Sequence, residues 1–119
     1  MVDDSAVLDR AFHALSDPSR RQMVARLTRG PASVSELARP FTMSLAAVVQ
    51  HVQVLEASGL VRSEKAGRVR TCRLEPVALR AVEGWMVDRR TEWEERLDRL
   101  GDFLQQDHHD DQTQEGNTP

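Results

Sequence analysis

The sequence predicts a mainly α-helical domain in which short helices precede a two-stranded hairpin and one long helix. Apolar residues recur three or four positions apart in several segments, and capping or stop signals separate these segments. Two β-rich runs flank a glycine turn. The chain has 119 residues, which is room for one domain with a modest core. Because only 4% of them are aromatic, we expect a core of Leu, Val and Ala.

The first two helices follow from apolar spacing and from a capping signal. A helix is predicted from about Asp4 to Leu15. Its stripe consists of residues three or four apart: Val7, Leu8, Ala11, Phe12 and Leu15. Asp17 can then cap a second helix, since its carboxylate accepts from a free N–H and Pro18 suits the first turn. This second helix is predicted to end near Thr28.

The next two helices form a helix-turn-helix. Ser33 with Glu36 three residues later is a capping box that opens a short helix. After a tight connection, Ser44 can cap a longer helix over about 44–57, which Gly59 ends. The inner face of this helix is apolar: Val48, Val52 and Leu55. Such a pair leaves the start of its second helix free to enter a DNA major groove.

A hairpin and a long helix complete the domain. The runs 60–64 and 69–74 are predicted strands, and Gly67 lies in the turn of a wing over about 60–74. Pro76 opens the longest helix, over about 76–104. Its stripe steps by three or four residues: Val82, Trp85, Arg89, Trp93, Leu97, Leu100 and Leu104. A single winged helix-turn-helix domain over 1–104 is therefore expected, with 105–119 as a disordered acidic tail.

The charges are segregated along the chain. Overall the chain carries −3. Residues 18–73 hold ten basic and three acidic side chains, a net charge of +7, whereas 76–119 hold five arginines and eleven acids, a net charge of −6. This asymmetry is typical of a phosphate-facing module joined to an element that does not bind nucleic acid.

The outward side of the 44–57 helix and the hairpin supply the candidate DNA-binding residues. On the helix these are Ser44, Leu45, Ala46, Val49, Gln50, His51 and Gln53, and on the hairpin Lys65, Arg68 and Arg70. Glutamine can pair with adenine, and small apolar side chains can contact thymine methyls. Ser44 at a helix N-terminus suits a phosphate, as do the hairpin cations. Double-stranded DNA is therefore the expected partner.

The order of these motifs resembles the ArsR family of bacterial repressors. The resemblance covers about Ala11 to Leu104. It rests on Ala14-Leu15-Ser16-Asp17-Pro18-Ser19-Arg20, Ser35-Glu36-Leu37-Ala38, Met43-Ser44-Leu45-Ala46-Ala47-Val48, the run from His51 to Val61, and Gly67 to Leu74. It implies a homodimer, held by the first and last helices, that binds a near-palindromic operator and represses transcription until a signal, not identified from the sequence, releases it.

The large apolar residues of those two helices are the candidate dimer interface. They are Leu8, Phe12, Trp85, Trp93, Leu97, Leu100 and Leu104. The two tryptophans would bury the most area in a pair of copies. An alternative is that they frame a pocket for an apolar ligand.

Metal and cofactor sites are not expected. Many ArsR-family relatives hold metal through cysteines in the helix before the 44–57 helix, or through Asp and His pairs on the last helix. Residues 36–40 contain no cysteine, and residues 76–104 contain no histidine. Cys72 is the only cysteine and is expected in the core. The cluster Asp107-His108-His109-Asp110-Asp111 could hold a divalent ion, but a solvated tail is the simpler interpretation.

The sequence also bears on whether the protein is an enzyme, where it is located and which other functions stay open. No catalytic grouping stands out, so we do not expect an enzyme. No apolar run could cross a membrane and no basic-then-apolar leader is present, so the cytoplasm is expected. Two alternatives stay open: a helical dimeric protein-interaction module that does not bind DNA, and a metal-responsive repressor.

Overall fold

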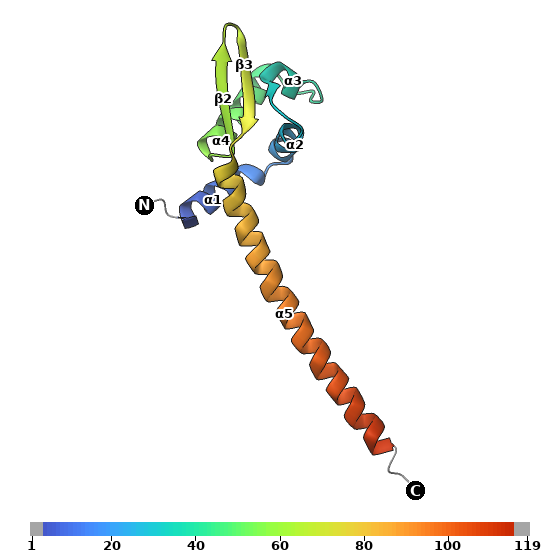
Figure 1. Cartoon of the computed structure of the whole chain (residues 1–119). Coiled ribbons are helices and arrows are strands. Elements are labelled where there is room, and N and C mark those ends of the chain that lie inside the picture. The colour runs from blue at the N-terminus through green and yellow to red at the C-terminus, as the bar shows by residue number, and fades with distance from the viewer. Residues whose placement is uncertain (1–3, 116–119) are drawn as a thin grey trace. The chain divides into compact units, whose positions relative to one another are not determined.

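The computed structural model describes the backbone of residues 4–115 and the side chains of residues 5–107. Its elements are α1 Asp4–Leu15, α2 Pro18–Leu27, β1 Ala32–Ser33, α3 Val34–Ala38, α4 Leu45–Ala57, β2 Val61–Ala66, β3 Val69–Leu74 and α5 Pro76–Glu115 (Figure 1). This order confirms the mainly α winged helix-turn-helix. The chain divides into two compact units, Met1–Glu83 and Gly84–Pro119, so the first unit ends well before the domain boundary that was expected near Leu104.

The helix caps form where the sequence predicts them. Asp17 has an extended backbone and its Oδ2 accepts from the N–H of Arg20 at 3.0 Å, with Pro18 in the first turn of α2. Ser33 Oγ accepts from the N–H of Glu36 at 3.1 Å. The Glu36 carboxylate then accepts from the Ser33 hydroxyl, at 3.2 Å, rather than from the Ser33 N–H that a capping box would use.

The sheet has one strand more than the hairpin that was predicted. Strand order is β1-β3-β2, all antiparallel, and the short β1 pairs Ala32 with Cys72. Ala66 faces Val69 across the hairpin, so the turn is two residues long. Gly67 has φ +64° and no non-glycine residue of the described backbone has a positive φ, which matches a type II′ turn.

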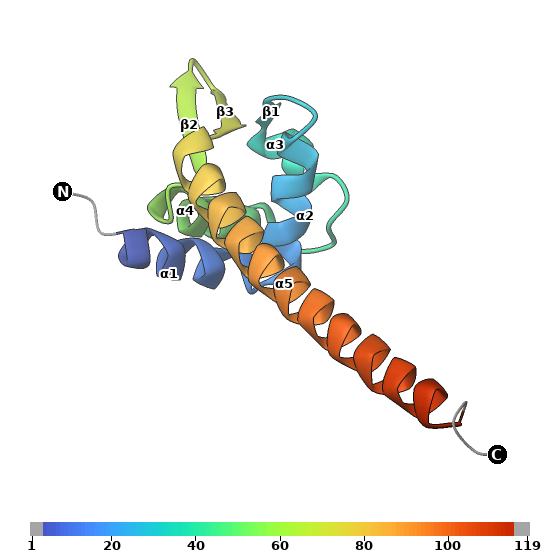
Figure 2. The same cartoon turned by 60° about the horizontal axis from the view of Figure 1, so that its bottom comes forward.

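The core lies where α1, α2 and α4 pack against one another and against the sheet (Figure 2). Its largest fully buried side chains are Met23, Leu37, Val48, Leu55, Leu60 and Cys72. The predicted inner face of α4 is confirmed, since Val48, Val52 and Leu55 are all buried. Cys72 is buried as expected, and burial raises the pKa of its thiol, so it packs as a small apolar side chain.

Helix α5 is longer than the sequence predicts. Ala78, in its first turn, is buried in the first unit, while every described side chain of the second unit, from Gly84 to Asp107, is exposed. The helix continues past Leu104 to Glu115. The physical reason is that no proline or glycine occurs between Gly101 and Gly116, so the backbone meets no stop signal.

Residues 116–119 lie outside the described part. Within residues 4–115 no helix, α5 included, has the apolar stretch that a membrane span requires.

The cap of α2 gives a prediction about pH. The hydrogen bond from the Arg20 N–H is the main cause that lowers the pKa of the Asp17 carboxyl below its ordinary value of 3.8, and the Arg20 guanidinium and the Ser19 N–H add to it against the opposing effect of desolvation. A lowered folded-state pKa means that the ionised carboxylate stabilises the fold fully above 3.8. That stabilisation is lost as the pH falls through the folded-state value.

We therefore expect Asp17→Asn to be less stable than the parent near pH 7, with a difference that narrows as the pH falls below 3.8, since asparagine retains a capping oxygen but no charge. Urea denaturation of both proteins across this pH range measures the gap. A gap that does not change with pH would contradict the role of the charge.

Candidate nucleic-acid interface

Helix α4 has one buried and one exposed side. Ser44 caps it, because its Oγ accepts from the N–H of Ala47 at 3.1 Å. The residues predicted to face outward are exposed: Ser44, Leu45, Ala46, Val49, Gln50 and Gln53. Leu45 keeps 55% of its surface exposed and Val49 keeps 36%, although both are apolar. The outer side of α4 is thus an apolar and amide surface available to a partner.

The first turn of α4, the start of α3 and the wing enclose one groove. The groove is lined by Ser33, Val34, Ser35, Leu45, Val49, Lys65, Arg68, Val69 and Arg70. Five of the predicted site residues therefore lie together. An adjoining hollow shares Val34, Val49 and Arg70 with it and adds Gln53. Ser44, Ala46 and Gln50 are exposed on α4 but line neither hollow.

The residues around the start of α3 that line this groove were not predicted as site residues. Ser33 was identified only as a helix cap, whereas Ser33, Val34 and Ser35 line this groove together with residues of α4 and the wing. The capping box was the signal that could have indicated them, because a helix N-terminus with hydroxyl side chains suits a phosphate.

The wing cations differ in how they are held. Arg70 Nη1 donates to Ser63 Oγ at 2.9 Å, and Ser63 Oγ in turn donates to the Glu56 carboxylate on α4. Lys65 and Arg68 are exposed, and among the described residues neither has a hydrogen bond or an ion pair. Arg70 is therefore fixed against α4, while Lys65 and Arg68 are free cations at the tip of the wing.

His51 is placed differently from the other predicted contacts. It is half-buried, and its Nδ1 lies 3.2 Å from Arg20 Nη1. A guanidinium only donates, so Nδ1 accepts and the ring carries its proton on Nε2. Asp17 Oδ2 is 4.0 Å from the same nitrogen, too far for a hydrogen bond. One edge of the His51 ring thus faces α2 and not the groove.

Arg20 connects three helices at this point. Its Nε donates to the Ala14 carbonyl at 2.6 Å and its Nη2 to the His13 carbonyl at 3.4 Å, both in the last turn of α1. The other Nη donates to His51 on α4. Arg20 is therefore a positioning residue for α4. The sequence did not indicate this role, because Arg20 is one of several basic residues in the same region.

Known proteins resemble the chain in sequence and in fold. A family model described as a helix-turn-helix domain matches residues 15–64. The HTH-type transcriptional regulator Rv2034 of Mycobacterium tuberculosis is 46% identical over 74 residues, which cover 62% of this chain and 69% of that protein. A crystal structure of an ArsR family transcriptional regulator is 47% identical and covers 79% of this chain and 97% of its own, with a TM-score of 0.71.

The chain belongs to the ArsR family of transcriptional regulators. The resemblance inferred from its motifs is thereby confirmed. A further ArsR-like structure, from Mycobacterium bovis, is a solution structure of a homodimeric winged helix-turn-helix DNA-binding domain. It is 25% identical, covers 75% of this chain and 88% of its own, and has a TM-score of 0.58.

The predicted dimer residues of this ArsR-family chain occur in both units. In the first unit, Leu8 is half-buried and Phe12 is 38% exposed. In the second unit the large apolar side chains are exposed: Trp85, Trp93, Leu97, Leu100 and Leu104. Arg89, the polar interruption of the stripe, lies with its guanidinium carbon 5.2 Å from the Trp85 ring centroid.

No group of three or more possible metal ligands occurs among the residues whose side chains are described. The cluster at 107–111 falls almost wholly outside them, because side chains are described only as far as Asp107. Binding of a metal by His108 and His109 therefore stays a prediction.

The contacts of Arg20 predict a loss of stability on substitution. Arg20→Ala removes three hydrogen bonds from a charged donor, and we expect it to lower the free energy of unfolding by about 2 kcal/mol. Urea denaturation measures this loss. Arg29→Ala is the matched control, since the Arg29 side chain is exposed and has no hydrogen bond or ion pair among the described residues, so it should change stability by less than about 0.5 kcal/mol. Equal effects of the two substitutions would contradict the role of Arg20.

Proposed function

We propose that this ArsR-family regulator is a repressor that binds a near-palindromic operator as a homodimer. The exposed side of α4 from each copy enters one of two successive major grooves of the duplex. The observation that carries this proposal is the groove in which the apolar start of α4 meets the cations of the wing. The protein acts by binding DNA in the cytoplasm, without a catalytic step.

Sequence would be read by the outer side of α4. Gln50 and Gln53 are exposed and can form paired hydrogen bonds with adenine. Leu45, Ala46 and Val49 offer methyl groups to thymine. Because His51 donates only through Nε2 once Arg20 holds Nδ1, it is assigned at most one contact, to an acceptor on a base or the backbone.

Phosphates would be held by the wing and by the start of α4. Lys65, Arg68 and Arg70 line the same groove as the hydroxyls of Ser33 and Ser35. Three cations in each copy give six in a dimer, and each neutralised phosphate adds about −0.9 to the slope of log affinity against log salt. The net charge of +7 over residues 18–73 supports this electrostatic contribution.

The wing gives a prediction about salt. We expect Arg68→Ala to reduce the magnitude of the salt slope by about 1.8 per dimer and to leave sequence preference unchanged, since a phosphate contact carries no base information. Fluorescence anisotropy with the DNA upstream of the protein's own gene, over a series of salt concentrations, measures the slope. Arg80→Ala is the control, because Arg80 is exposed on the first turns of α5 and lines neither hollow.

An unchanged slope for Arg68→Ala would remove the wing from the interface. A parent protein that shows no specific binding to this DNA at low salt would overturn the proposed function itself and favour the protein-interaction module.

A homodimer is supported by the apolar surface that the chain exposes. The second unit alone exposes five large predicted interface residues, and apolar patches of this kind mark interaction sites. The homodimeric relative from Mycobacterium bovis supports the same assembly. We therefore assign α5 and the exposed part of α1 to contact between two copies.

This assignment predicts the effect of removing a tryptophan. Trp93 is 60% exposed in the single chain, and burial of both copies of its ring would be lost in Trp93→Ala. We expect the dimer dissociation constant to rise by at least about a hundredfold. Sedimentation velocity over a concentration series measures the shift. Thr91→Ala is the control, since two residues place Thr91 about 200° around the helix. A Trp93→Ala protein that remains as dimeric as the Thr91→Ala protein would refute the interface.

A further inference from the structure

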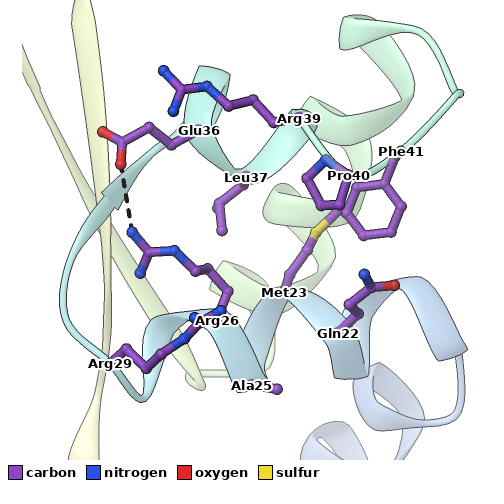
Figure 3. A pocket seen from close by; sticks show the side chains of 10 residues that line it. All are labelled: Gln22, Met23, Ala25, Arg26, Arg29, Glu36, Leu37, Arg39, Pro40 and Phe41. Carbon is purple, nitrogen blue, oxygen red and sulfur yellow. Dashed lines mark hydrogen bonds and ion pairs between the residues drawn. The ribbon is translucent and has the colours of Figure 1, made fainter.

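A cavity of about 520 Å³ lies between α2 and α3 (Figure 3). None of the residues assigned above to DNA binding or to dimerisation lines it. Its walls come from the last turns of α2, from α3 and from the connection that leads to α4. The cavity is therefore separate from the sites of the proposed function.

The floor of the cavity is apolar. Met23 and Leu37 project from α2 and α3 into the space between the two helices, and the Phe41 ring closes one end (Figure 3). Met23 and Leu37 belong to the core, and Phe41 is half-buried against it. Because Met23 is only 1% exposed and Leu37 only 2%, the apolar surface that a guest can reach comes mainly from the Phe41 ring and from the exposed Pro40.

The rim is cationic. Three arginines line the cavity, Arg26, Arg29 and Arg39, against a single acid, Glu36. Arg26 Nη2 is 3.4 Å from Glu36 Oε2, and both side chains keep about a third or more of their surface in solvent. Such a partly exposed ion pair contributes little and can be exchanged for another anion.

The other two arginines have no protein partner for their guanidinium groups. Within residues 5–107, neither the Arg29 nor the Arg39 side chain has a hydrogen bond or an ion pair, and both are exposed. The rim thus carries an excess of two positive charges beside an apolar floor. A guanidinium binds a carboxylate, sulfonate or phosphate through two parallel hydrogen bonds, which gives this rim a preference for such groups.

We propose that this cavity binds a small amphipathic organic anion, with its apolar body on Pro40 and Phe41 and its acidic group on the arginine rim. The apolar floor distinguishes this guest from inorganic phosphate or the DNA backbone, which have no apolar part to place there. The site goes beyond the proposed function. It also touches α4 indirectly, because Arg39 to Phe41 begin the connection that ends at the Ser44 cap.

A pair of probes that differ only in charge tests the proposal on the full chain. Anilinonaphthalene sulfonate has an aromatic body and one anionic group, and phenylnaphthylamine is the same body without the sulfonate. Fluorescence titration should give a dissociation constant at least about tenfold lower for the sulfonate than for the neutral probe. Equal affinities, or no binding of the sulfonate, would overturn the proposal.

Two sets of variants locate the site. Arg29→Glu combined with Arg39→Glu should weaken binding of the sulfonate at least about tenfold and leave the affinity for the neutral probe unchanged. Arg80→Glu should change the affinity for neither probe. Ala25 is exposed and lines the cavity, so Ala25→Phe should fill the space and weaken both probes, and Ala66→Phe adds the same ring on the wing as a control.

Circular dichroism melting establishes that each variant is folded before it is titrated. Sulfonate binding that is unaffected by both the double variant and Ala25→Phe would place the probe elsewhere, for example on the exposed residues of α5, and would overturn the proposal. Because these titrations contain no DNA, their outcome is independent of the test of operator binding.

Discussion

The position of α4 depends on one guanidinium at its edge. Arg20 joins two carbonyls in the last turn of α1 to the ring of His51 on α4. Carbonyls at the end of a helix lack partners within it, and arginine is the side chain with enough donors in a fixed geometry to satisfy several at once. Its backbone N–H completes the cap of α2 at Asp17. A single residue therefore fixes α1, α2 and α4 relative to one another where their apolar faces end.

The functional surface follows from this constraint. With Val48, Val52 and Leu55 turned inward, the other side of α4 has to face away from the core. The sheet then sets the wing beside it, and the hydrogen bonds from Arg70 through Ser63 to Glu56 tie the hairpin to α4. The wing tip stays free of such ties, so its cations can adjust to a phosphate backbone while the helix beside it remains fixed.

Local signals in the sequence predicted most of the fold, and contacts between distant residues account for what was missed. Asp17, Ser33 and Ser44 each act on an N–H three residues away, so short patterns identify the caps. Strand β1 has only two residues and exists through its pairing with β3, which no local pattern announces. The Arg20 to His51 bond spans 31 positions, and the cavity between α2 and α3 likewise depends on packing between elements.

The acidic C-terminal segment and the basic domain can belong to one DNA-binding protein because, in the function we propose, the basic domain contacts phosphates and the acidic segment pairs two copies. A net charge of −6 over residues 76–119 disfavours contact between α5 and phosphate. Its exposed apolar side chains can nevertheless raise DNA affinity by pairing two copies, since the second copy then binds at the effective concentration set by the first. When two copies are paired in this way, a few cations in each wing are enough for DNA binding.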